Sequence, residues 1–182
     1  PRSGLDVDIS LDNRLAIHNS MMLKSYAQEE RLQRLIQMVK YWASRRGINN
    51  AFEGTLSSYA WTLLSIQHAQ LVQPPLAPNR QKDVEPNPLT FKGTTYDVSY
   101  NDEHFATKNN QSLASLLISF FERFATRWDW ETMVVSIRSG EALSAKAKKW
   151  QHTGPLPLEV VIGADDGWME HIMPIEDPYN HE

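Results

Sequence analysis

Two aspartates near the start of the chain have the spacing of a metal-binding strand. In the segment LDVDISL at 5–11, apolar residues alternate with Asp6, Asp8 and Ser10, and this period of two predicts a strand with one apolar face. Carboxylates that project from a strand suit Mg²⁺, which prefers oxygen ligands, and in phosphoryl transfer they hold metal ions over the reacting phosphate. Two solvated acids on a half-buried strand would give the same pattern.

Two further groups of residues have the chemistry of a phosphate and base site. Lys40 lies at the border of an apolar helical stripe, with Ser44 one turn later on the same side, and its ammonium can be directed into a cleft. In GTLSSYAW at 54–61, Ser58 and Tyr59 stand at the expected start of a helix. Hydroxyls and free amides there bind phosphate, and a tyrosine ring can stack on a base. A surface lysine and a serine N-cap explain the same residues without a ligand.

Four helices and a strand are expected to position these groups. Helical spacing of apolar residues and capping signals predict helices over 15–28, 29–47, about 57–72 and 112–128. A strand is predicted over 132–138, and the Pro-rich and Asn-rich stretch at about 74–111 is expected to be an extended loop or a partly ordered excursion. Four tryptophans are interpreted as packing residues of the core: Trp42, Trp61, Trp128 and Trp130.

The composition is typical of a globular protein and does not favour a domain dedicated to binding double-stranded nucleic acid. The 182 residues can enclose a substantial core, and the net charge of −4 differs from the basic surface that a duplex-binding domain usually carries. No cysteine is present, which excludes disulfides and thiolate metal sites. We find no apolar run of membrane-spanning length and expect no membrane partner. A cytoplasmic location is expected, with the mitochondrion as the alternative.

The order of these motifs resembles one enzyme family over nearly the whole chain. The segments DVDISLDNRLAIHNSMMLKSY, VKYWASRRGINN, GTLSSYAWTLL and IEDPYN closely resemble the template-independent RNA nucleotidyltransferases of the polymerase-beta superfamily. These are the terminal uridylyltransferases and the cytoplasmic-type poly(A) polymerases. The resemblance is strongest over 5–79 and returns at 112–138 and 172–180.

The resemblance implies a helix-rich α+β fold in two parts. Residues 1–18 would end a polymerase-beta-type palm, and 19–182 would form a helical central, poly(A)-polymerase-associated domain with a loop-rich insert at about 74–111. Asp8 would be the third of three metal-binding and catalytic aspartates. The first two belong to an upstream Asp-x-Asp segment, so we expect a companion N-terminal segment or chain that carries them.

The resemblance also assigns the nucleotide-binding residues. Asn19 and Ser20 would contact the ribose and phosphate region, and Lys40 would neutralise the triphosphate, with Ser44 where relatives often have a second lysine. Ser58 would bind phosphate and Tyr59 would stack on the base. Asp177 would read the base edge. Asn180 stands where uridylyltransferases commonly have an acid, which weakens the inference of uracil preference.

The implied reaction adds UMP from UTP to an RNA 3′-hydroxyl by a two-metal mechanism with Mg²⁺ or Mn²⁺. The preference for UTP over ATP depends on Asn19, Tyr59 and Asp177. Two alternatives remain open: a poly(A) polymerase of the same fold, and a non-catalytic nucleotide-binding or scaffold module. The second is motivated by the first two catalytic aspartates, which are not among these 182 residues.

Overall fold

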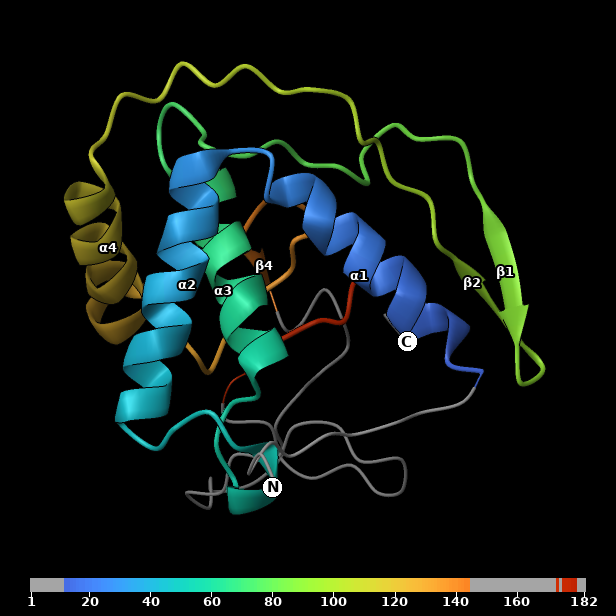
Figure 1. Cartoon of the computed structure of the whole chain (residues 1–182), viewed down its shortest axis with the longest axis horizontal. Coiled ribbons are helices and arrows are strands. Elements are labelled where there is room, and N and C mark those ends of the chain that lie inside the picture. Colours follow the sequence, from blue (N-terminus) through green and yellow to red (C-terminus); the bar gives the residue numbers. More distant parts are fainter. Residues whose placement is uncertain (1–11, 145–172, 174, 180–182) are drawn as a thin grey trace, which may run out of the picture.

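Four α-helices form the body of the described part of the chain, and the β1–β2 hairpin lies at its edge (Figure 1). In the computed structural model, residues 12–144, 173 and 175–179 are described here. The helices are α1 (Arg14–Tyr26), α2 (Glu30–Arg45), α3 (Ser58–Leu71) and α4 (Leu113–Glu122). A 3₁₀ turn, η1 (Ala51–Glu53), precedes α3, and a π-helical turn, η2 (Arg123–Arg127), continues α4. The strands are β1 (Pro88–Phe91), β2 (Thr94–Asp97), β3 (Met133–Val134) and β4 (Leu143–Ser144).

The first three helices begin where their local sequence predicts. Asn13, Glu29 and Ser57 are their N-caps, and each side chain accepts a hydrogen bond from a backbone amide of the first turn. The helices predicted over 15–28, 29–47 and about 57–72 are therefore confirmed, with ends that shift by one or two residues. The helix predicted over 112–128 divides into α4 and η2.

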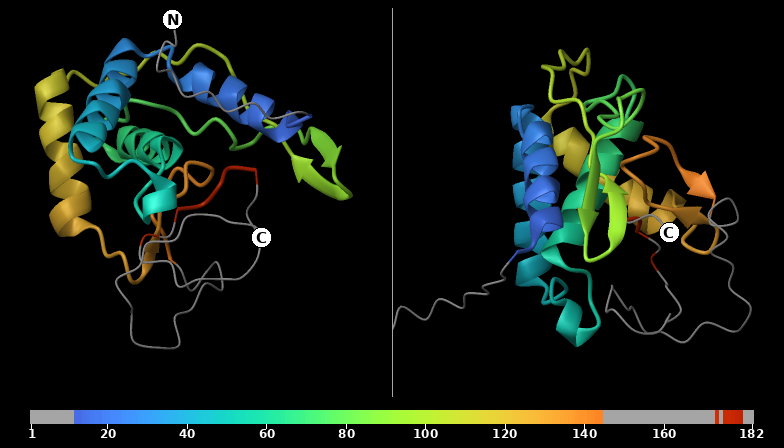
Figure 2. Two further views of the ribbon diagram at one scale, coloured as in Figure 1. Left: turned by 60° about the horizontal axis from the view of Figure 1, so that its bottom comes forward. Right: turned by 90° about the vertical axis from the view of Figure 1, so that its right-hand side faces the viewer.

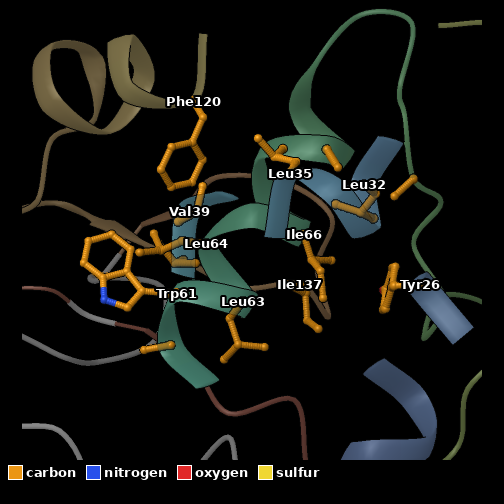
Figure 3. Close-up of a cluster of buried hydrophobic side chains, with 14 of the residues drawn as sticks. Tyr26, Leu32, Leu35, Val39, Trp61, Leu63, Leu64, Ile66, Phe120 and Ile137 are labelled. Carbon is orange, nitrogen blue, oxygen red and sulfur yellow. The ribbon is translucent and has the colours of Figure 1, made fainter. Parts of the chain in front are cut away.

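The centre of the core is α3, which is covered on all sides. Every residue from Ala60 to Gln70 is buried, and a helix that is buried all round must have neighbours on each face. α2 packs against both α3 and α4 (Figure 2). Figure 3 shows side chains from α2, α3 and α4 meeting in one apolar cluster, with Ile137 beside Ile66.

Polar side chains of α3 bond to a different neighbour on each side. Gln67 accepts a hydrogen bond from the backbone amide of Ser136 and donates one to the carbonyl of Glu141, 3.0 Å away. Gln70 donates to the Tyr26 hydroxyl at 3.2 Å. A slip of one residue in α3 would break these bonds and leave buried polar groups unpaired, so they fix the helix in one register.

The stretch at about 74–111 is mostly irregular but contains one short hairpin, which the sequence did not locate. β1 and β2 form an antiparallel hairpin with Phe91 opposite Thr94. Its two-residue loop is Lys92 and Gly93, with φ of 48° and 85°, and positive φ at both positions matches the right-handed twist of the strands. The Lys-Gly pair between two short β-prone runs was the signal for this turn, and the surrounding Pro and Asn residues obscured it.

The fold agrees with the expected helix-rich α+β class, although little of the predicted strand over 132–138 is regular. β3 contains two residues and pairs with β4, and the next residue, Val135, forms a parallel bridge with Ile175. The strand predicted over 5–11 lies outside the described residues.

All four tryptophans pack in or against the core, as expected. Within the described part of the chain, no helix combines the length and apolarity needed to span a bilayer.

Candidate nucleotide-binding site

A direct hydrogen bond joins two of the predicted site residues across the length of the chain. The Tyr59 hydroxyl donates to Oδ2 of Asp177 at 3.2 Å, although the two residues are 118 positions apart. Tyr59 lies in the first turn of α3, and Asp177 lies in the segment 175–179 that returns beside it. The fold therefore brings together the residue expected to stack on a base and the residue expected to read the base edge.

The Tyr59 hydroxyl remains a hydrogen-bond donor under ordinary conditions. Burial, the negative charge of Asp177 and the hydrogen bond to Asp177 all raise the pKa of Tyr59 above its usual value. Because each of these effects disfavours the phenolate, the phenol is neutral near pH 7. The bond to Asp177 then fixes the direction of the ring.

Short backbone contacts hold Asp177 on both sides. Before it, the amide of Glu176 donates to the carbonyl of Val135 at 2.8 Å. After it, the amide of Tyr179 donates to Oδ1 of Asp177 itself at 2.9 Å. One carboxylate oxygen thus orders the local turn, and the other bonds Tyr59.

At the start of α3, the two adjacent serines have different roles. The Ser57 hydroxyl caps the helix by accepting from the amide of Ala60 at 3.1 Å. The hydroxyl of Ser58, the first helical residue, makes no hydrogen bond to any described residue, and the side chain is half-buried. Ser58 can therefore donate to an anion at the positive end of the helix.

Lys40 lies on the neighbouring helix, toward the same end. α2 ends and α3 begins at one end of the helix pair, so the second half of α2 lies near the start of α3 (Figure 1). Lys40 is half-buried and forms no ion pair with a carboxylate of the described residues, whereas Ser44 is exposed. The cation is thus available to an anionic ligand.

The two predicted site residues on α1, Asn19 and Ser20, differ in whether their side chains form hydrogen bonds. Ser20 is exposed and donates its hydroxyl to the carbonyl of Ala16 at 2.8 Å. The side-chain oxygen of Asn19 is buried and accepts no hydrogen bond from the described residues. Buried polar atoms normally have a partner, so the Asn19 oxygen is an unsatisfied acceptor among the described residues.

The predicted metal ligand cannot be placed. Asp8 and Asn180 both lie outside the described residues. Among the residues that are described, no group of three or more His, Asp or Glu side chains could hold a metal ion. The described part of the chain therefore offers groups for a nucleotide but no donor set for Mg²⁺.

Two hollows in the described surface lie apart from the Tyr59–Asp177 pair. A groove of about 450 Å³ between α2 and α4 is lined by apolar side chains, with Arg45 and Arg46 among its lining residues. A smaller hollow of about 240 Å³ is lined by α1 residues, including His18 and Met21, and by residues of the 84–100 stretch. Neither is lined by Tyr59 or Asp177.

Comparison with known proteins identifies the family. Residues 112–182 match the family model described as Cid1 family poly A polymerase. The chain is 33% identical over 145 residues to the mouse poly(A) RNA polymerase GLD2, and 36% identical over 154 residues to the fission yeast poly(A) RNA polymerase cid13. The chain belongs to the template-independent RNA nucleotidyltransferases. The motifs quoted from the sequence had indicated the same family.

Solved structures of this nucleotidyltransferase family share the fold. The structure of a cytoplasmic RNA terminal U-transferase superposes with a TM-score of 0.77 at 31% identity, covering 94% of this chain and 51% of the other. The Cid1 poly(U) polymerase gives a TM-score of 0.75 at 31% identity, covering 92% and 49%. The expected fold class is therefore confirmed.

The match covers only part of each relative. It includes 78% of this chain and 30% of mouse GLD2, and 81% of this chain and 27% of cid13. The chain thus spans less than a third of the length of these curated nucleotidyltransferases.

Sequence reasoning assigned no role to two residues that contact the site. Gln81 and Arg138 both donate to the carbonyl of Pro178, the residue after Asp177. Neither belongs to a chemical motif, and only the tertiary structure brings them to this carbonyl.

Proposed function

We propose that this protein transfers a nucleotide from a nucleoside triphosphate to the 3′-hydroxyl of an RNA, with UTP preferred over ATP. The observation that carries the proposal is the hydrogen bond between Tyr59 and Asp177, because it pairs a stacking surface with a carboxylate that can accept from a base edge. Structures of relatives bound to a UTP analogue and to a short ApU product support nucleotide and RNA as the partners.

The proposal assigns each described residue a binding role. Tyr59 supports the base by stacking and Asp177 accepts from its edge. Ser58 and Lys40 bind the triphosphate, where a helix N-terminus and a cation with no ion pair among the described residues favour negative charge. The side-chain oxygen of Asn19 accepts from a ribose hydroxyl. Catalysis by these groups consists of positioning and charge neutralisation.

A divalent cation, Mg²⁺ or Mn²⁺, is proposed as the cofactor, with Asp8 as one ligand. When bound, it would supply charge stabilisation at the reacting phosphate. A related structure that contains Mg and 3′-dATP supports this proposal. The other two aspartates of the family's metal site are proposed to come from a companion segment or chain.

A poly(A) polymerase is the second candidate. The relatives GLD2 and cid13 are both named poly(A) RNA polymerases, and Asn180 replaces the acid common in uridylyltransferases. Because an asparagine can donate as well as accept, it suits more than one base edge.

One experiment separates the candidates. The full-length protein is incubated with an RNA primer, Mg²⁺ and each of the four nucleoside triphosphates in turn, and UTP and ATP binding are titrated in parallel. UTP-dominated extension is expected. ATP-dominated extension would replace the uridylyl proposal with the adenylyl one. Binding without any extension would identify a non-catalytic module, and no binding would overturn the nucleotide site itself.

Asp8→Ala tests the proposed metal role in the same assay. Extension should be lost while nucleotide binding and the thermal midpoint stay close to wild type, because the change removes a carboxylate ligand of the ion and no apolar side chain. Retained extension would contradict the assignment of Asp8.

A further inference from the structure

The backbone beside Asp177 is held by two side chains from distant parts of the chain. The carbonyl of Pro178 accepts from Nε2 of Gln81 at 3.2 Å and from Nη1 of Arg138 at 3.4 Å. Gln81 lies in the insert before β1, and Arg138 follows β3. Pro178 is buried, and both donors reach it from partly buried positions.

Arg138 is itself oriented from two directions. Its Nη2 lies 3.9 Å from Oδ2 of Asp97, the last residue of β2. Its own carbonyl accepts from the side-chain amide of Asn79 at 2.8 Å. The guanidinium therefore links the hairpin of the insert to the segment that contains Asp177.

Asp97 is a fixed anion in this network. Its Oδ1 accepts from the amides of Asn87 and Ser99 at 3.0 Å and 3.1 Å. Burial acts to raise the pKa of Asp97, but these hydrogen bonds and the charge of Arg138 outweigh it and lower the pKa. An ionised carboxylate that is held by two amides gives Arg138 a stable partner.

We propose that Arg138 is a positioning residue for nucleotide selection, which holds Asp177 at the base edge by bonding Pro178 while Asp97 orients the guanidinium. This inference rests on the proposed function. Asp177 lies between two backbone anchors, the Glu176–Val135 bond and the Pro178 carbonyl. Loss of the second anchor frees the carboxylate to move, and recognition of a base edge requires placement to within about 0.5 Å.

Arg138→Gln in the full-length protein tests this role through steady-state kinetics with UTP and ATP. KM for the preferred nucleotide should rise about 3- to 10-fold, which corresponds to one hydrogen bond, with kcat within about twofold of wild type. The ratio of kcat/KM for UTP to that for ATP should move toward one. Arg138→Lys should recover part of the loss, because a cation opposite Asp97 is retained.

Two further variants make the test independent of a folding defect. Gln81→Met removes the other donor to Pro178 and should raise KM in the same direction. Arg34→Gln is the matched control, because Arg34 pairs with Glu30 on the exposed side of α2, and it should change neither KM nor selectivity. The double variant Asp97→Asn/Arg138→Gln should raise KM by less than the product of the two single fold-changes, since both substitutions act on one contact.

The outcomes separate this inference from the proposed function. One outcome overturns the positioning role and leaves the proposed function intact. In this outcome the wild type uses nucleotides and Tyr59→Ala raises KM, but Arg138→Gln and Gln81→Met leave KM and selectivity unchanged. An equal loss of kcat for both nucleotides at constant KM would indicate a purely structural role and also overturn it. If wild type binds neither UTP nor ATP, the proposed function fails and this inference fails with it.

Discussion

Tyr59 is the residue on which the proposed nucleotide site depends most. Its ring is expected to lie against a base, and its hydroxyl is already committed to Asp177. A tyrosine that is anchored in this way loses little rotamer freedom when a ligand binds. The hydroxyl and the ring therefore make contributions that separate substitutions can distinguish.

Tyr59→Ala should raise the nucleotide KM about 10-fold or more, because loss of base stacking is worth about 1–3 kcal/mol. Tyr59→Phe keeps the ring and removes only the bond to Asp177, so its KM should rise by about 2- to 5-fold. Initial rates over a range of UTP concentrations give both values. An equal rise in KM for the two substitutions would mean that Tyr59 contributes to nucleotide binding through its hydroxyl and not through stacking of its ring.

His68 makes the stability of the core depend on pH. Burial, and then the charge of Arg123, lower the pKa of His68 from its ordinary 6.5 to about 4. Its Nδ1 accepts from Nε of Arg123 at 3.1 Å, which requires the neutral ring. Between pH 6.5 and 4 the unfolded chain takes up a proton that the folded protein does not. The free energy of unfolding should therefore fall by up to about 3 kcal/mol as the pH drops through this window.

Chemical denaturation at several pH values between 7 and 4 measures this dependence. His68→Gln should lower stability at pH 7 but give a flatter pH profile, because it removes the titrating group. His104→Gln, at an exposed position, is the control and should leave the slope unchanged. An unchanged slope in His68→Gln would show that other groups cause the acid sensitivity.

At the scale of elements, the start of α3 combines a structural and a functional requirement. Ser57 caps the helix, and Ser58 presents its hydroxyl at the same terminus without a partner among the described residues. The capping and phosphate-binding interpretations of the sequence are therefore compatible, and they fall on adjacent residues.

The pair Ser57→Ala and Ser58→Ala should separate stability from binding. Ser57→Ala should cost about 1 kcal/mol of unfolding free energy, as expected for loss of an N-cap, with a small effect on KM. Ser58→Ala should raise KM for the nucleotide and leave the thermal midpoint nearly constant. Denaturation curves and nucleotide titrations on both variants test this. A loss of stability in Ser58→Ala and a higher KM in Ser57→Ala would mean that Ser58 caps the helix and Ser57 binds the nucleotide.

The helices could be predicted because their signals are local. Capping residues and apolar spacing define α1, α2 and α3 within a residue or two. The β1–β2 hairpin was missed because its strands have four residues each and stand among prolines and asparagines, where periodicity is too short to detect. β3 has only two residues and pairs with the equally short β4, and the next residue, Val135, bridges to the distant Ile175, which no local pattern contains.

At the scale of the whole molecule, stability depends on the packing of α3 against its neighbours. Leu64 is fully buried in this contact (Figure 3), and Leu64→Ala should cost about 2–5 kcal/mol of unfolding free energy. For a chain of this length, the thermal midpoint should fall by roughly 5–15 °C. Ile118→Ala is the control, because Ile118 is 68% exposed on α4, and it should change stability by less than about 0.5 kcal/mol.

For the candidate site, only family motifs point to its residues. The resemblance assigns a role at the base to Tyr59 and another to Asp177, and the fold joins these two residues directly. Gln81 and Arg138 reach the same segment through long-range contacts, and a glutamine in a loop or an arginine after a strand has no distinguishing pattern. The residues that hold a site in place are harder to read from sequence than those that touch a ligand.

The distance of 118 residues between Tyr59 and Asp177 also has a consequence for biosynthesis. As the chain leaves the ribosome, α1 to α4 can assemble around α3 well before the segment 175–179 emerges. The contact between Tyr59 and Asp177 then forms after the helical core. A nascent chain with a complete helical core would still lack one side of the proposed nucleotide site until residue 177 was synthesised, so nucleotide binding would follow folding of the core as a separate, later event.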